Sequence, residues 1–387
     1  MDGKRIVVLG GGLGGIVCVN RLRELLGKEH RIILVDEKDS HVYYPSLLWL
    51  IFGWRRAEEI RRDFNLLTKK GIEFLKGALE EIQVNKKIVI VDGKELKFDY
   101  LVISTGTELD KKPFPKTPGI YNFYCLEGAA LAGEKIKSFS SGRVVILIGS
   151  APFKCPAAPY ELGFLLDSFF KNKKIRDRVE IEIYTPEPLP MPTAGERMGL
   201  AIKSMLEKRN IGFNPGHKFE SVSEDEIDFG NNKNVGFDLL LYVPINKGPQ
   251  FLRNTELVNE AGWIPVDRET LKTKFENIYA IGDITTIKLP GQYEPNKPLN
   301  LPKAGVFSHY QAEVAAERIY SEIHGEIPNR KFKGKGSCFL ESGNSVSSFA
   351  DGNFYKLPYP KVRMYPPLRI WHWAKICFEK WWLWRWF

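Results

Sequence analysis

Residues 5–15, RIVVLGGGLGG, join a short apolar run to a glycine-rich turn. Gly10, Gly12 and Gly15 follow the GxGxxG pattern, in which a buried strand turns tightly into a helix whose amino end can hold a pyrophosphate. The next apolar run ends at Asp36, 21 residues beyond Gly15, where a carboxylate can accept hydrogen bonds from ribose hydroxyls. This pattern predicts a dinucleotide-binding βαβ unit at the start of the chain.

The same alternation continues along the chain. Strands are expected at 98–103, 143–148, 179–184, 237–243 and 278–281, and helices at 160–170 and around 312–319. This order predicts an α/β fold with two Rossmann-like, doubly wound domains built on parallel sheets, the second inserted in the first. The expected divisions are 1–110 and 241–330 for the first, cofactor-binding domain, 111–240 for the inserted domain, and 331–387 for a separate C-terminal region.

Composition narrows the functional classes. The 387 residues are 43% apolar and carry a net charge of +9, with the basic residues spread along the chain rather than gathered in one block. Nucleic-acid binding is therefore not expected, whereas attraction to anionic lipid or to small anions fits. We expect no secretory signal and no transmembrane helix. The five cysteines lack metal-site spacing, so no metal is expected.

Two further motifs favour FAD over NAD as the ligand of the first domain. Residues 273–283, TKFENIYAIGD, end in Gly282-Asp283, and Thr105-Gly106 forms an earlier turn. Together with the first glycine loop, they resemble the FAD motifs of the pyridine nucleotide-disulfide reductase superfamily, in which the aspartate corresponding to Asp283 contacts the ribityl chain. The resemblance implies that FAD is bound by Gly10, Gly12, Gly14, Gly15, Asp36, Glu37, Thr105, Gly106, Gly282, Asp283, Lys303 and Ala304.

The second glycine loop departs from the pattern that binds a nicotinamide dinucleotide. A GxGxxG motif starting at Gly149 would need glycines where Ala151 and Lys154 stand, and Tyr184 is followed by Thr-Pro rather than by an acid. A lysine where the helix must press on the sheet, with Pro152 and Pro156 nearby, is expected to obstruct dinucleotide binding, so NADH is disfavoured as electron donor. Cys155 stands in this loop, beyond the carboxyl end of a strand, where such folds place their ligands. A chemical role is therefore favoured over simple packing.

The altered loop resembles that of the sulfide:quinone oxidoreductases and, more distantly, of the flavin subunits of flavocytochrome sulfide dehydrogenases. Residues 45–54 (PSLLWLIFGW), residues 301–305 (LPKAG) and Cys338 in GSCFLE carry the same resemblance. It implies that a sulfur relay between Cys155 and Cys338 oxidises sulfide to zero-valent sulfur or polysulfide. The electrons would then pass through FAD to a membrane quinone. A type II NADH:quinone oxidoreductase, or a flavin subunit that docks a cytochrome, is the alternative.

The resemblance also implies roles for three other residues. Cys125 matches a third cysteine that in some relatives is linked to the flavin and in others assists sulfur transfer. Glu161 could relay protons to quinone, or could simply be an acid favoured at a helix start. Lys303 could place positive charge near the flavin, or could be a solvated surface lysine.

The tail, residues 366–387, holds six of the nine tryptophans. At helical spacing, one side carries Arg369, His372, Lys375, Glu379 and Lys380, and the other carries Ile370, Ala374, Cys377, Phe378 and Trp381. Tryptophan favours the lipid headgroup level and basic residues favour anionic lipid. The tail is too charged to span a bilayer, so it predicts an amphipathic segment that holds the protein on the cell membrane peripherally. An interface in a homo-oligomer is the alternative.

Overall fold

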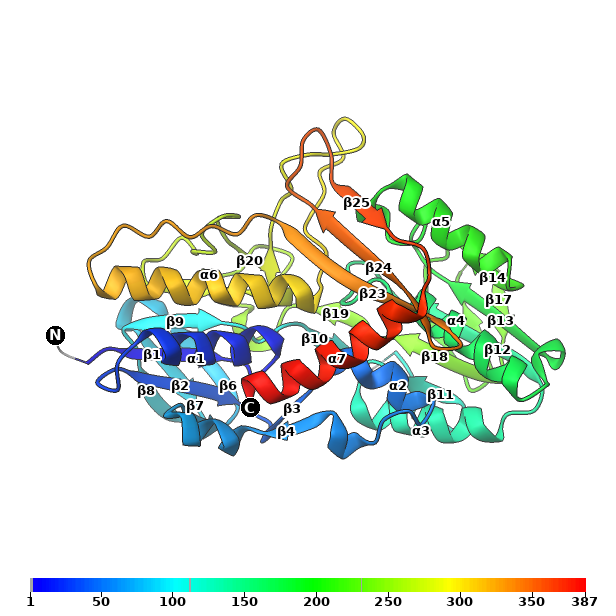
Figure 1. Cartoon of the computed structure of the whole chain (residues 1–387), viewed down its shortest axis with the longest axis horizontal. Coiled ribbons are helices and arrows are strands. Elements are labelled where there is room, and N and C mark those ends of the chain that lie inside the picture. Colours follow the sequence, from blue (N-terminus) through cyan, green and yellow to red (C-terminus); the bar gives the residue numbers. More distant parts are fainter. Residues whose placement is uncertain (1–2, 111–112, 231) are drawn as a thin grey trace.

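The computed structural model describes residues 3–110, 113–230 and 232–387, and it confirms the α/β architecture with two parallel sheets (Figure 1). The first sheet has the order β21 (Ile278–Ala280), β9 (Tyr100–Ile103), β1 (Arg5–Leu9), β2 (Arg31–Asp36) and β5 (Glu73–Lys76). The second has the order β11 (Ile120–Asn122), β18 (Leu239–Val243), β12 (Gly142–Ile148), β13 (Val179–Tyr184) and β14 (Ile211–Asn214). All neighbours in both sheets are parallel.

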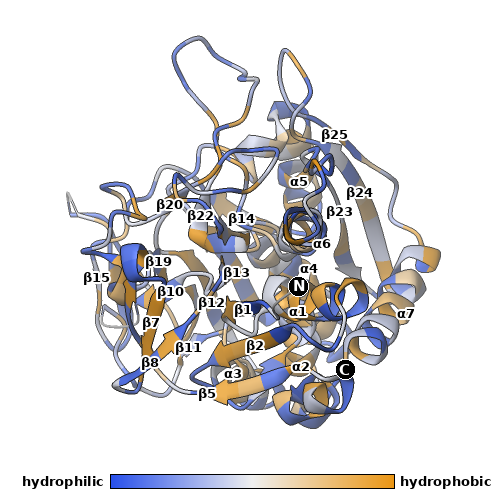
Figure 2. Cartoon of the chain, turned by 90° about the vertical axis from the view of Figure 1, so that its left-hand side faces the viewer, coloured by the Kyte–Doolittle hydropathy of each residue, from blue (hydrophilic) through white to orange (hydrophobic). Residues whose placement is uncertain are grey.

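The side chains of each strand alternate between two apolar layers, one on each face of the sheet. In β1, Ile6 and Val8 pack with α1 (Leu13–Leu25) and α6 (Gly305–Ile323), whereas Val7 and Leu9 pack with the antiparallel sheet of β6, β7 and β8. Successive side chains of a strand point to opposite faces, so a strand buried on both sides is apolar throughout. That is why RIVVL has no polar alternation. In Figure 2, β2 of this sheet is largely orange, the colour of hydrophobic residues.

The second sheet repeats this arrangement. One face is covered by α4 (Ala158–Asn172) and α5 (Glu196–Glu207), and the other by β15 (Ser221–Val222), β16 (Glu226–Asp228) and β17 (Asn234–Gly236). The predicted boundary at 240 falls inside β18, so the inserted domain ends three residues later, at Val243. The other predicted boundary of the inserted domain lies between residues 110 and 111, and residue 111 is outside the described residues.

Smaller elements complete the two domains. They are β3 (Ser40–Val42), β4 (Arg61–Asp63), β6 (Leu79–Gln83), β7 (Ile88–Val91), β8 (Lys94–Lys97), β10 (Glu108–Asp110), β19 (Ile245–Lys247), β20 (Ile264–Pro265), β22 (Thr285–Thr286), α2 (Leu47–Ile51) and α3 (Leu126–Ser138). Strands β10 and β19 pair antiparallel where the chain passes between the domains.

The C-terminal region is a three-stranded antiparallel sheet followed by a helix. The strands are β23 (Lys335–Gly343), β24 (Val346–Asn353) and β25 (Lys361–Met364), and the helix is α7 (Arg369–Trp386). The amide of Glu341 in β23 donates to a carboxylate oxygen of Glu161 in α4. Helix α7, red in Figure 1, extends from β24 to α1. It therefore contacts the C-terminal sheet at one end and the first domain at the other.

The expected helix at the tail is confirmed, but its polar side faces the protein instead of lipid. His372, Lys375 and Glu379 are buried, whereas Trp373 and Trp384 are 60% and 77% exposed. We call His372, Lys375 and Glu379 the polar face, and Ile370, Trp373, Phe378, Trp381 and Trp384, all exposed, the aromatic face. Buried carboxylates on neighbouring elements explain this orientation, since a buried charge needs a partner. No helix in the described ranges is long and apolar enough to cross a bilayer.

Candidate cofactor and redox site

The first glycine loop has the backbone geometry that a pyrophosphate site needs. Gly10 has a φ of +95°, and a Cβ on Gly15 would lie 1.9 Å from the carbonyl oxygen of Gly10. A Cβ on Gly12 would meet nothing within 4 Å, so this glycine faces open space. The loop thus needs glycine for its turn and for helix packing, while the helix amino end beyond Gly12 is accessible to an anion.

Asp36 and His41 hold this loop in place. The Asp36 carboxylate accepts hydrogen bonds from the amides of Gly11 at 2.6 Å and Lys38 at 2.8 Å. His41 is buried with its Nδ1 2.9 Å from the Gly11 carbonyl oxygen, and burial lowers its pKa to about 4. The imidazole is therefore neutral at pH 7 and donates from Nδ1. Glu37, beside Asp36, is exposed. Sequence reasoning gave His41 no specific contact.

Polar atoms without partners line the far end of the predicted FAD site. Asp283 Oδ1 and Thr105 Oγ1 are buried without a hydrogen-bond partner among the described residues. Gly106 and Gly282 both have positive φ, as turns at the ends of β9 and β21. Because buried polar atoms normally find partners, these atoms fit a polyhydroxylated ligand such as the ribityl chain. The residues present therefore fit FAD.

Lys303 is part of the same wall. It is 8% exposed, so the alternative of a solvated surface lysine is wrong. Its Nζ donates to the carbonyl oxygens of Asp283 at 2.5 Å and Thr285 at 3.3 Å and lies 3.5 Å from the Trp263 ring centroid. Burial lowers the pKa of Lys303 to about 8. Ala304 follows as the N-cap of α6.

Cys155 and Cys338 come together although 183 positions separate them. Cys155 lies in the loop between β12 and α4, in a left-handed conformation with φ +51°, and its amide donates to the Lys303 carbonyl oxygen at 2.7 Å. Cys338 lies in β23, which packs against α4. Both are free thiols, close enough that charge on Cys338 raises the pKa of Cys155. We call Cys155, Cys338 and Glu161 the sulfur site.

The sulfur site is partly open to solvent. Cys155 is exposed and Cys338 is half-buried. Burial first, and the nearby Glu161 second, raise the pKa of Cys155 to about 12 and that of Cys338 to about 11. Burial also raises the pKa of Glu161, which is 5% exposed in the first turn of α4. A thiolate formed here is costly unless a cation stabilises it.

The polar face of α7 provides that cation, which sequence reasoning missed. Lys375 Nζ lies 2.5 Å from Glu161 Oε1 and 3.7 Å from Glu341 Oε1, and His372 Nδ1 lies 3.0 Å from Glu341 Oε1. Glu379 is paired with Arg55 at 2.6 Å. The available signal was the acidic Glu379 one turn after Lys375, because an acid among basic residues suits buried pairing better than contact with anionic lipid.

Cys125 has a local structural role. It is the N-cap of α3, and its sulfur accepts a hydrogen bond from the Gly128 amide at 3.4 Å. The contact with the Cys155 loop is made by the neighbouring residue, since the Tyr124 hydroxyl donates to the Cys155 carbonyl oxygen at 3.1 Å.

The altered second loop differs from expectation in two details. Lys154 does not press between helix and sheet, because its Nζ lies 4.3 Å from the centroid of the Tyr44 ring. Burial raises the pKa of the Asp283 carboxyl, and the charges of Lys303 and Lys154 partly oppose that rise. An acid also follows β13 after all: Glu187, buried, accepts a hydrogen bond from the Tyr160 hydroxyl at 2.9 Å. Glu187 is engaged by this tyrosine, so it is not free to hold a ribose.

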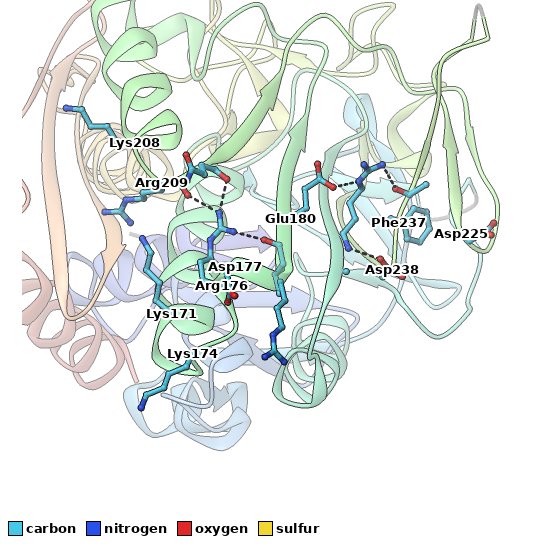
Figure 3. A pocket seen from close by; sticks show the side chains of 16 residues that line it. Lys171, Lys174, Arg176, Asp177, Glu180, Lys208, Arg209, Asp225, Phe237 and Asp238 are labelled. Carbon is cyan, nitrogen blue, oxygen red and sulfur yellow. Dashed lines mark hydrogen bonds and ion pairs between the residues drawn. The ribbon is translucent and has the colours of Figure 1, made fainter.

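A hollow of about 1210 Å³ lies elsewhere (Figure 3). Its lining includes the first residues of β12 and β13, the amino ends of parallel strands, whereas doubly wound sheets bind ligands at the carboxyl ends. Its charges include ion pairs such as Arg143 with Glu180 at 2.8 Å. We therefore assign the chemistry to the sulfur site. No cluster of acidic, histidine or cysteine side chains suited to a metal ion occurs in the part of the chain that the structure describes.

Comparisons with known proteins agree with this geometry. Over 368 residues the chain is 27% identical to the mitochondrial sulfide:quinone oxidoreductase of Dictyostelium discoideum, covering 90% of this chain and 77% of that protein. It is 25% identical over 398 residues to the sulfide-quinone reductase of Aquifex aeolicus, covering 99% and 91%. The solved sulfide:quinone oxidoreductase structure from Aquifex aeolicus, with a TM-score of 0.88, 24% identity and coverage of 99% and 91%, shows the same fold. Residues 4–305 match the family described as pyridine nucleotide-disulphide oxidoreductase. The chain therefore belongs to this family and is an FAD-dependent oxidoreductase.

Proposed function

We propose that the protein is a sulfide:quinone oxidoreductase, which oxidises sulfide to zero-valent sulfur or polysulfide and reduces a membrane quinone. The observation that carries the proposal is that Cys155 lies beyond the carboxyl end of β12, in the loop that leads to α4, and that β23, which carries Cys338, packs against α4. In this loop Lys154 and Ala151 stand where a nicotinamide dinucleotide would need glycines. A redox-capable thiol pair occupies the place of the usual electron donor, and curated relatives carry the same activity in their names.

Each group then has a defined task. Cys155 and Cys338 exchange sulfur with hydrosulfide by thiol–disulfide chemistry, which needs an accessible sulfur and a leaving thiolate. FAD, when bound by the glycine loop, Asp36 and Asp283, accepts a pair of electrons and passes it on. Lys303 places a donor and positive charge beside Asp283. Glu161 exchanges protons, and Cys125 assists sulfur transfer or holds the flavin.

The proposal that a membrane quinone is the electron acceptor rests on α7. Its aromatic face presents Trp373, Trp381 and Trp384 to solvent, and indoles favour the headgroup level of a bilayer. We propose that this face holds the protein peripherally on the cell membrane, so that quinone reaches the flavin from the lipid. A homo-oligomer interface is the second candidate for the same face, because it would also cover exposed apolar side chains.

Anaerobic flavin spectroscopy tests the function. Sulfide should bleach the flavin absorbance, a short-chain quinone should restore it, and NADH should do neither. Cys155→Ser and Cys338→Ser should each abolish bleaching by sulfide while retaining FAD, because neither residue belongs to the glycine loop. Rapid bleaching by NADH without any response to sulfide would refute the proposal and favour an NADH:quinone oxidoreductase. A flavin that sulfide reduces but only a cytochrome reoxidises would favour the cytochrome-docking alternative.

A further inference from the structure

The polar face of α7 is built against the sulfur site and not against solvent. Lys375 is 8% exposed and its Nζ lies 2.5 Å from Glu161 Oε1, 3.7 Å from Glu341 Oε1 and 4.9 Å from the Trp49 ring centroid. Glu341 is fully buried in β23, three residues after Cys338. Three separate elements, α4, β23 and α7, thus bring these charged groups together. Two of the elements lie beside the cysteines in the chain, since Glu161 in α4 follows the Cys155 loop and Cys338 stands in β23.

Ion pairing with Lys375 alone does not neutralise both buried carboxylates. Glu161 and Glu341 bring two carboxylates, and Lys375 is shared between them; His372 contacts Glu341 from the same helix. Burial by itself would lower the pKa of Lys375, but the two carboxylates outweigh burial and raise it. Lys375 therefore stays protonated, and its positive charge opposes the effects of burial and of Glu161, which keep the pKa values of Cys155 and Cys338 raised.

The chemistry of sulfur exchange needs such a cation. When HS⁻ attacks a sulfur–sulfur bond between Cys155 and Cys338, that bond breaks and a new one forms, which gives a Cys–S–SH persulfide and a Cys–S⁻ thiolate. The negative charge that entered with hydrosulfide remains on the leaving thiolate. It remains in a site where burial and Glu161 both disfavour anions, so the exchange depends on a nearby positive charge.

We propose that Lys375 is the positioning residue that stabilises this thiolate, and that α7 therefore serves the sulfur site with its polar face. This deepens, and rests on, the proposed sulfide oxidation. Helix α7 is fixed there at both ends of the polar face: Glu379 binds Arg55 and accepts from the Ser46 hydroxyl at 2.6 Å, and His372 binds Glu341. Farther along, Asn20 of α1 donates to the Trp386 carbonyl oxygen at 3.1 Å.

Site-resolved alkylation measures the thiolate without sulfide and without turnover. Full-length, FAD-loaded protein in detergent would be reduced, exposed to iodoacetamide across a pH series, and digested to quantify modification at Cys155 and Cys338. Lys375→Met should slow alkylation at pH 8 by about tenfold or more, since one unit of pKa is a tenfold change in thiolate fraction. Lys375→Arg should keep most of the rate because it keeps the charge. Lys380→Met, exposed on the same helix, is the matched control and should change nothing.

A second variant is expected to change the alkylation rate in the opposite direction. Glu161→Gln removes an anion next to the thiols and leaves Lys375 paired with Glu341, so alkylation should become faster. This variant also keeps the proposal testable if Lys375→Met does not fold. Unchanged rates in Lys375→Met, or slower alkylation in Glu161→Gln, would overturn the inference. Wild-type flavin that sulfide does not reduce would instead overturn the proposed function, and the alkylation result would stand independently of it.

Discussion

The aromatic face of α7 yields a quantitative prediction for membrane attachment. Trp373 and Trp384 are 60% and 77% exposed, and neither belongs to the buried side of the helix, so Trp373→Gln/Trp384→Gln should leave the fold intact. A tryptophan buries up to about 250 Å², and burial of apolar area contributes about 25 cal/mol per Å². The exposed parts could therefore contribute about 4–5 kcal/mol each if fully buried.

Insertion at the headgroup level is only partial, so we take about 1–2 kcal/mol for each indole. The double variant should then bind vesicles about 30- to 1,000-fold more weakly, since 1.4 kcal/mol is a factor of ten. Co-sedimentation with phosphatidylcholine vesicles containing an anionic lipid measures this ratio. Leu200→Gln/Ile327→Gln, which also removes two exposed large apolar side chains but off α7, is the matched control and should sediment like the wild type.

Two results would refute the reasoning about lipid. The double variant could sediment as well as the wild type, or the wild-type protein could fail to sediment with vesicles at all. Analytical ultracentrifugation without lipid separates the second candidate for this face. If the aromatic face joins subunits, the wild type should be an oligomer in detergent-free buffer and the double variant a smaller species.

Three further predictions follow from other contacts. Gly15→Val places a side chain 1.9 Å from the Gly10 carbonyl oxygen, so the purified protein should lack flavin absorbance; normal FAD content would contradict the assigned loop. Burial raises the pKa of Glu187 from 4.5 to about 7, so the folded protein holds this proton to higher pH than the unfolded chain, and stability falls as pH rises through about 7. Glu187→Gln should remove that fall, of up to about 3 kcal/mol, in urea unfolding at pH 5 and pH 8; an unchanged pH dependence would contradict it. Ending the chain at Met364 removes α7 with the buried Trp382, Leu383 and Trp386, each of which contributes about 1.5–3 kcal/mol, so the thermal midpoint should fall; an unchanged midpoint would show that α7 is not needed for the fold.

Local sequence determined the fold class and the cofactor loop. The apolar runs of β1 and β2 and the spacing of Gly10, Gly12 and Gly15 depend on neighbours along the chain, so strand, turn and helix could be predicted from them. Loss of the second glycine loop was visible for the same reason, because Ala151 and Lys154 stand where the motif needs glycine. The turn at Gly282-Asp283 is likewise a local pattern, and it indicated FAD. The precise end of the inserted domain could not be predicted this way, because β18 is defined by pairing with β12 and β11, strands from earlier in the chain.

Only the tertiary structure decided what the charged residues do. Helical spacing separated His372, Lys375 and Glu379 from the aromatic side chains, but periodicity cannot tell which of two faces is turned inward. The deciding groups, Glu161 and Glu341, lie on α4 and β23. A buried carboxylate draws in a distant cation because desolvation of an unpaired charge costs more than the ordering of the helix that neutralises it. That long-range electrostatic requirement turned Lys375 toward Glu161 and Glu341, and it left Trp373, Trp381 and Trp384 on the outer side of α7.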